Sequence, residues 1–163
     1  MERLPIIQNL TNRILFRQTR ANRVFNDFIL CLEGKTSENF LFTLLNLMSL
    51  IILVDPKFRK NVENFDARYV FMYKSENLYI VAHFKNNKLN VKKSRVTDPN
   101  LTLVFKDGKA LFKLLLSESP DVLNAILNQE VDFNGNLNYL NKFAYMAMRL
   151  KLMAEKLAPV KKA

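Results

Sequence analysis

Apolar and polar positions alternate along the middle of the chain with a period of two. The alternation runs from Arg68 to Tyr73 and again from Leu78 to Phe84, which is typical of strands with one buried face. Asn86-Asn87 then marks a turn. Two more alternating segments, Leu89 to Val91 and Leu101 to Phe105, predict a third and a fourth strand. We expect an antiparallel meander with one solvated face.

The pattern becomes helical after the fourth strand. Asp107 is suited to cap a helix, because its carboxylate accepts the first backbone N–H groups. Ser119-Pro120 predicts the start of a second helix, since proline fits the first helical position. A short strand at Val131 to Phe133 ends at Gly135, and a long amphipathic helix follows from Leu137 to about Leu157. This part of the chain therefore belongs to the α+β fold class.

A basic amphipathic helix is predicted at the N-terminal end, from about Ile7 to Leu32. Its arginines fall together beside the apolar stripe. Such a helix can dock on a membrane or cover its own domain. We favour covering, because Asp27 and Glu33 dilute the positive charge.

The most apolar segment of the chain follows, from Phe40 to Val54. Ser37 is suited to cap it and Asp55-Pro56 to end it. It is shorter than the roughly 18 to 20 residues that span a bilayer. Thr43, Asn46 and Ser49 add a thin polar line to it at three-residue spacing. We expect a helix buried in the protein or at a subunit interface, with membrane contact as the alternative.

The residues that enzymes use for catalysis are sparse. Cys31 is the only cysteine, and no Cys or His cluster can hold a metal. His83, the only histidine, occupies an outward position on a predicted strand, and the three glycines stand too far apart for a phosphate cradle. We therefore expect no enzyme, no cofactor and no metal. Without an export signal or cysteine pairs, a cytoplasmic location is expected.

The formal net charge of +10 favours an anionic partner. The run from Lys85 to Arg95 concentrates five basic residues with no acidic one, and these are Lys85, Lys88, Lys92, Lys93 and Arg95. Asparagine and aliphatic residues stand between them, whereas nucleic-acid binding strands place aromatic residues there, so nucleic acid is an improbable partner. A transient contact with an anionic membrane surface and a merely solvated basic face both remain open.

The stretch from Asp66 to Leu157 resembles the sterol carrier protein family, type two. The resemblance rests on the sequence from Val131 to Leu137 ahead of the last helix, on Asp107 opening a helix after a strand, and on Pro120 ahead of the next helix. It implies a five-stranded, mostly antiparallel sheet covered by helices. It also implies a hydrophobic tunnel between them for a lipid of the fatty acyl, sterol or isoprenoid class.

The apolar faces of the predicted elements would supply the lining of this tunnel. The expected lining residues are Phe71, Leu103, Phe105, Leu111, Leu115, Phe133, Leu140, Phe143, Met146 and Leu150. We expect a lipid-binding domain at residues 66–157, a helical extension packed on it at 1–65, and a disordered tail at 158–163. The predicted function is non-catalytic binding of a hydrophobic ligand. The alternative is a protein–protein interaction module with a self-filled pocket, which forms a homodimer through its apolar N-terminal helix.

Overall fold

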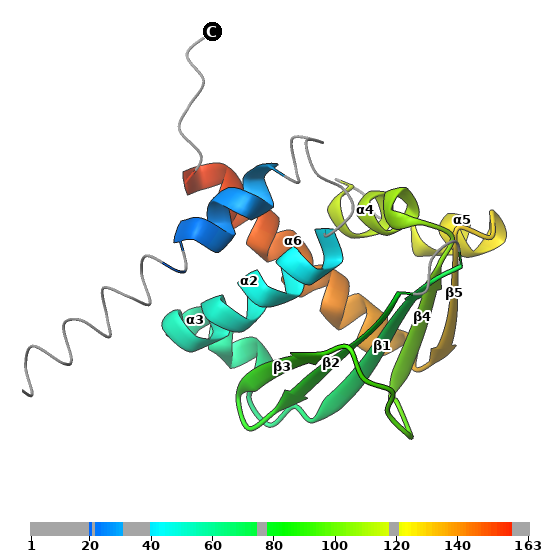
Figure 1. Cartoon of the computed structure of the whole chain (residues 1–163), viewed down its shortest axis with the longest axis horizontal. Helices are drawn as coiled ribbons and strands as arrows, with labels where there is room; N and C mark the ends of the chain where they lie inside the picture. The colour runs from blue at the N-terminus through cyan, green and yellow to red at the C-terminus, as the bar shows by residue number, and fades with distance from the viewer. Residues whose placement is uncertain (1–19, 21, 31–39, 75–77, 118–120, 158–163) are drawn as a thin grey trace, which may run out of the picture.

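A computed structural model describes residues 20, 22–30, 40–74, 78–117 and 121–157 of the chain. Residues 22–30 are helical. The elements that follow are α2 (Phe40–Val54), α3 (Pro56–Arg59), the 3₁₀ turn η1 (Lys60–Val62), β1 (Ala67–Tyr73), β2 (Tyr79–Lys85), β3 (Lys88–Lys92), β4 (Leu101–Phe105), α4 (Gly108–Leu116), α5 (Val122–Leu127), β5 (Val131–Gly135) and α6 (Leu137–Leu157). Figure 1 shows the helices gathered on one side of a five-stranded sheet.

The sheet has the strand order β3-β2-β1-β4-β5. Its β1–β4 pairing is parallel and the other three are antiparallel, which confirms the predicted α+β fold with a mostly antiparallel sheet. The meander is correct for the first three strands and wrong for the fourth, which lies beside β1. A period of two tells which face of a strand is buried but does not tell which strand lies next to it.

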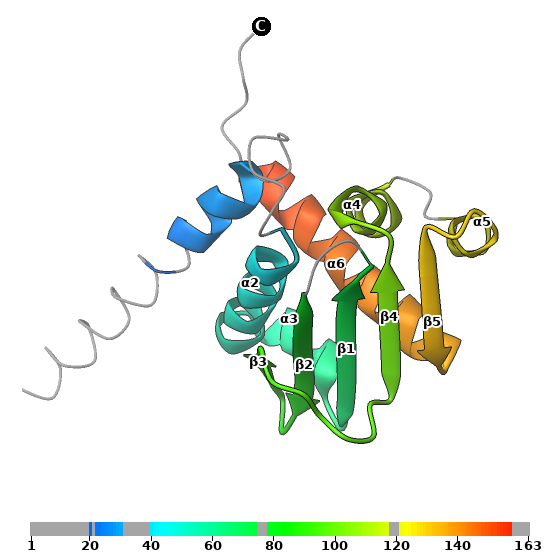
Figure 2. The same ribbon diagram turned by 45° about the vertical axis from the view of Figure 1, so that its right-hand side comes forward.

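The connection from β3 to β4 crosses the sheet on the side opposite the helices (Figure 2). Hydrogen bonds to β1 fix its path. Arg68 Nη1 donates to Thr97 O at 3.1 Å, and Asn100 Oδ1 accepts from Arg68 N at 2.7 Å. The predicted turn between β2 and β3 is confirmed, with Asn86 and Asn87 at φ 51° and 58°, the left-handed values of a two-residue hairpin.

Aspartates begin three of the helices. The predicted cap at Asp107 is confirmed, because its Oδ1 accepts from Ala110 N at 2.9 Å. α5 begins after Asp121, whose Oδ1 accepts from Asn124 N at 2.9 Å. The helix therefore starts at Val122 and not with a proline, and Ser119-Pro120 lies outside the described residues. Asp55 ends α2 and also caps α3, a short helix that the sequence pattern did not predict.

α2 is a buried helix, as predicted. Eight of its fifteen residues are buried, and they belong to the same hydrophobic core as the inner face of the sheet, α4 and α6. In the described part of the chain, no single helix is long and apolar enough to cross a bilayer. α2 with Pro56–Val62, bent by 107°, has only the length and composition of a broken span. The predicted cap Ser37, most of the helix from Ile7 to Leu32 and the C-terminal tail lie outside the described residues.

Candidate functional site

The ten predicted lining residues meet in one region, between the inner face of the sheet and helices α4 and α6. Strands β1, β4 and β5 contribute Phe71, Leu103, Phe105 and Phe133, and the two helices contribute the other six. Nine of the ten are at most 1% exposed, and Phe133 is half-buried against the same core. The strand alternation and the helical period therefore direct these side chains to one interior.

Aromatic rings from β1, β2 and α6 form the centre of this region. The Phe71 and Phe143 ring centroids lie 4.9 Å apart, and Tyr69 lies 5.6 Å from Phe143 and 5.5 Å from Phe84. Pairs at these distances add about 0.5 to 1.5 kcal/mol each to the gain from burial. Sequence reasoning did not include Tyr69 in the site, although it shares the strand alternation that identified Phe71.

The Tyr69 hydroxyl is the polar group of this aromatic centre. It donates a hydrogen bond to Tyr139 O in the first turn of α6, at 2.9 Å. Burial, with a smaller contribution from Tyr139, raises the pKa of Tyr69 well above its ordinary value of 10.0. The hydroxyl therefore stays protonated at neutral pH and can only donate and accept hydrogen bonds.

The interior of the described part of the chain contains no buried polar or charged residue. No group of His, Cys, Asp or Glu among these residues is arranged to hold a metal ion. His83 lies on the outer face of the sheet, where its Nε2 is 3.0 Å from Asp66 Oδ1. That hydrogen bond lowers the pKa of Asp66, which is fully exposed. The region between sheet and helices thus offers apolar surface and the hydroxyls of two buried tyrosines, Tyr69 and Tyr73, and the described residues place no buried carboxylate or imidazole there.

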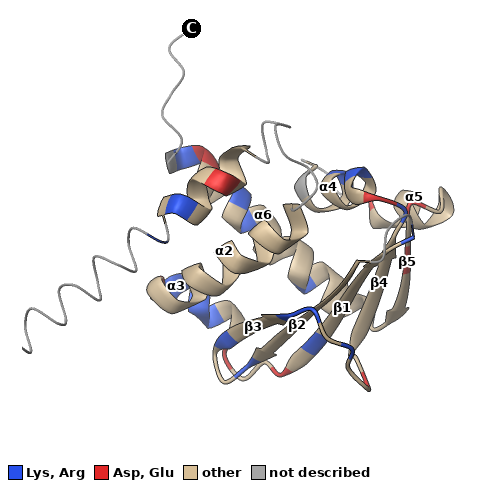
Figure 3. Ribbon diagram, viewed as in Figure 1, with Lys and Arg blue, Asp and Glu red and all other residues tan. Residues whose placement is uncertain are grey.

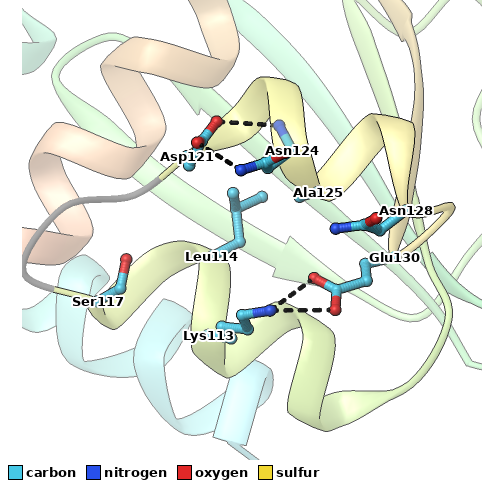
Figure 4. Close-up of a pocket in the computed structure, with 8 residues that line it drawn as sticks. All are labelled: Lys113, Leu114, Ser117, Asp121, Asn124, Ala125, Asn128 and Glu130. Carbon is cyan, nitrogen blue, oxygen red and sulfur yellow. Dashed lines mark hydrogen bonds and ion pairs between the residues drawn. The ribbon is translucent and has the colours of Figure 1, made fainter.

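A small cavity lies between α4 and α5 (Figure 4). Its two carboxylates already have partners: Glu130 accepts from Lys113 Nζ at 3.1 and 3.2 Å, and Asp121 accepts from the backbone N and side-chain Nδ2 of Asn124, both at 2.9 Å. Leu114 and Ala125 add apolar atoms. The volume is about 170 Å³, below the roughly 300 to 1,000 Å³ of ordinary ligand pockets. We do not assign a ligand to it.

Two larger, open grooves lie elsewhere on the surface. One of about 460 Å³ lies between α2 and the side chains of Arg20, Val24 and Asp27. The other, of about 570 Å³, lies beside the β2–β3 turn and is lined by Phe65, Asp66 and three asparagines. The ten predicted lining residues contribute to neither groove, nor to the cavity between α4 and α5.

The five basic residues of the predicted anionic-surface contact fall into two groups. Lys85 Nζ lies 3.7 Å from Asp66 Oδ2, so its charge is partly compensated. The other four, Lys88, Lys92, Lys93 and Arg95, are exposed and form no ion pair with another described residue. Figure 3 shows basic residues along β3 and the segment that follows it. The Lys93 ammonium lies 5.2 Å from the ring centroid of Phe42 in α2.

No family model and no curated protein matches the sequence. Solved structures do match. The ubiquinone synthesis protein UbiJ-SCP2 aligns with a TM-score of 0.55 and 14% identity over 66% of this chain and 87% of that one. A Thermus thermophilus protein described as possibly a sterol carrier protein aligns with a TM-score of 0.50 and 12% identity over 78% and 94%.

An enzyme also contains this fold. The inverting sec-alkylsulfatase of a Pseudomonas species aligns with a TM-score of 0.51 and 16% identity over 69% of this chain but only 16% of its own. At these identities the likeness shows the fold alone. The chain therefore has the fold of sterol carrier protein domains, and the resemblance predicted from the sequence is confirmed at that level.

Proposed function

We propose that this protein binds a lipid or another long hydrophobic molecule between the sheet and helices α4 and α6, without acting on it chemically. The observation that supports this best is the uninterrupted apolar interface that runs from β1 and β4 to α4 and α6. The fold supports it by analogy, since the ubiquinone synthesis protein UbiJ-SCP2 and a protein described as possibly a sterol carrier protein align with the chain.

Ligand entry requires the helices to move away from the sheet. The proposed lining side chains pack on one another, so a ligand would replace contacts such as the 4.9 Å one between Phe71 and Phe143. Burial of each large side chain contributes about 1.5 to 3 kcal/mol, which is lost when the helices separate from the sheet. A long apolar molecule restores this contribution, because it buries the same side chains again. The Tyr69 oxygen keeps a lone pair after donating to Tyr139 O and can accept from a ligand hydroxyl. Binding is therefore driven by apolar contact and oriented by one polar group.

The absence of chemistry is part of the proposal. General acid–base catalysis needs a titratable group within hydrogen-bond reach of the substrate. The described core holds two titratable side chains near the proposed ligand, Tyr69 and Tyr73, and burial keeps the proton on Tyr69. The carboxylates of the α4–α5 cavity are engaged by Lys113 and Asn124.

Lipid extraction followed by mass spectrometry, together with displacement of a fluorescent fatty acid, tests this function. Phe133→Ala removes a half-buried lining ring at the edge of the region and should weaken binding. Phe112→Ala is the matched control, because Phe112 is also half-buried but its ring packs on that of Phe40 in α2, with ring centroids 5.1 Å apart. No lipid in the extract and no displacement at any chain length would refute the proposal.

Dimerisation through the apolar helix is not favoured. α2 buries eight of its fifteen residues in the core of its own chain, so most of the apolar surface that motivated the pairing is already covered. Analytical ultracentrifugation should give a monomer. We further propose a cytoplasmic protein in transient contact with an anionic membrane, where lipids are exchanged, and cell fractionation tests that location.

A further inference from the structure

The outward side of α2 differs from its buried side. Phe42, Leu53 and Val54 are 38%, 42% and 48% exposed. Phe42 and Leu53 line the groove of about 460 Å³ that Arg20, Val24 and Asp27 line on its other side. Two polar side chains in the groove have partners within the chain: Asn46 Nδ2 donates to Phe42 O at 2.9 Å, and Ser49 Oγ donates to Leu89 O at 2.8 Å. These two hydrogen bonds are therefore formed without a polar ligand.

Lysines lie at both ends of this apolar set, while the carboxylates of Asp27 in the groove and Asp55 after Val54 lie near it. The bond from Ser49 to Leu89 fixes α2 against the edge strand β3, and the Lys93 ammonium lies over the Phe42 ring. Lys57 follows Val54 at the other end of α2 and is exposed. Neither lysine forms an ion pair with a described residue. We call Phe42, Leu53, Val54, Lys57 and Lys93 the α2–β3 face.

We propose that the α2–β3 face docks on the surface of a bilayer that contains anionic phospholipids. Uncompensated lysines beside half-exposed aliphatic and aromatic side chains suit the boundary between headgroups and acyl chains. Each lysine near an anionic surface gains about 1 kcal/mol, and Lys88, Lys92 and Arg95 on and after β3 extend the positive field. A duplex nucleic acid would use the cations but not Leu53 and Val54. A second copy of the chain would bring the same cations together.

The location of this face separates it from the two most exposed apolar residues of the described chain. Leu123 and Leu127 on α5 are more exposed, at 67% and 69%, but α5 itself carries no charged residue. α5 lies at the β5 end of the sheet, opposite β3 (Figure 2). Exposure alone would favour α5 for membrane contact, whereas exposure combined with charge favours the α2–β3 face. The two surfaces therefore give opposite results in one assay.

Single tryptophans distinguish the two surfaces, because the natural chain has none. Phe42→Trp and Leu127→Trp are prepared in the full chain and mixed with vesicles of phosphatidylcholine, with or without phosphatidylglycerol, some carrying brominated acyl chains. We expect a blue shift and quenching by bromine for Phe42→Trp only, with the phosphatidylglycerol vesicles only, and weakening with salt. Quenching of Leu127→Trp instead, or equal binding to phosphatidylcholine alone, would overturn the proposal. So would binding to a DNA duplex without binding to vesicles.

Substitutions then measure how much the residues of the α2–β3 face contribute to vesicle binding. Leu53→Asn with Val54→Asn should weaken vesicle binding about tenfold or more, since nearly half of each side chain is available for burial. Lys93→Gln should weaken it about fivefold. Leu123→Asn with Leu127→Asn is the control and should change nothing; unchanged binding by the Leu53/Val54 pair would contradict the docking. This docking proposal rests on the membrane contact proposed above. Fatty-acid displacement in the absence of vesicles tests the ligand site separately, so docking and ligand binding can each fail without the other.

Discussion

Replacing Gly135 with alanine should strongly destabilise the fold, although the substitution adds only one methyl group at an exposed position. Gly135 ends β5 with φ +129°, a left-handed conformation that side chains rarely adopt. A Cβ at this position would lie 2.3 Å from Asn100 O and 3.0 Å from Leu101 Cα. Both neighbours are backbone atoms, so no side chain can rotate away.

The cost follows from two contributions. The backbone conformation itself costs about 1 to 3 kcal/mol once a Cβ is present. Relief of the clash would shift Asn100, which exchanges hydrogen bonds with Arg68 at 2.7 and 2.8 Å where the crossing segment meets β1. Each such bond is worth about 1 kcal/mol. We expect Gly135→Ala to lose about 3 to 5 kcal/mol, a large share of the stability of a domain of this size.

Urea unfolding followed by circular dichroism measures this loss. Gly108→Ala is the matched control, because Gly108 is the first residue of α4 and does not have a positive φ. The control should be unchanged or up to about 1 kcal/mol more stable. A loss below about 1 kcal/mol for Gly135→Ala would refute the strained geometry and with it the β4–β5 register, which sets Phe133 opposite Leu103.

Three further predictions concern individual groups. Tyr69→Phe removes the hydrogen bond to Tyr139 O and should lower the free energy of unfolding by about 1 kcal/mol in urea titrations. Because burial raises the pKa of Tyr69, the stability from its neutral hydroxyl is complete below about pH 10 and is lost as the pH rises towards the higher folded pKa, so alkaline unfolding should be weaker in Tyr69→Phe. Asp107→Ala removes the cap on Ala110 N and should cost about 1 kcal/mol, and Asp121→Ala should cost less, because its short helix buries only Ala125. Equal losses at the two caps would contradict the packing of α4 and α5.

The sequence predicted those features that local periodicity determines. The limits of α2 at Phe40 and Val54 agree with the structure, as do the strand faces and the cap at Asp107. Each of these features depends on residues that are close to each other in the sequence. The interior position of the ten predicted lining residues follows from the same periods, because a helix or strand has one apolar face to bury.

The long-range features could not be predicted in this way. The parallel pairing of β4 with β1 depends on hydrogen bonds from Arg68 to Thr97 and Asn100. These two residues lie 29 and 32 positions after Arg68 and carry no periodic signal. The exposure of Phe42 and Leu53 could not be predicted either. An apolar run such as Phe40–Val54 does not show which of its sides the neighbouring strand leaves uncovered. Only the thin polar line of Thr43, Asn46 and Ser49 marked that side, and all three residues line the groove there.

α2 connects the two proposals because its two sides face different surroundings. Its buried side, with Leu44 and Met48, belongs to the core that includes Leu150 of α6 and Leu103 of β4. Its outward side carries Phe42 and the other apolar residues of the α2–β3 face. The Ser49 bond to Leu89 O joins the two parts of that face, so a bilayer that binds it contacts the helix that covers the proposed ligand region. Docking would therefore bring the proposed ligand region to the membrane surface, with α2 between the bilayer and the core.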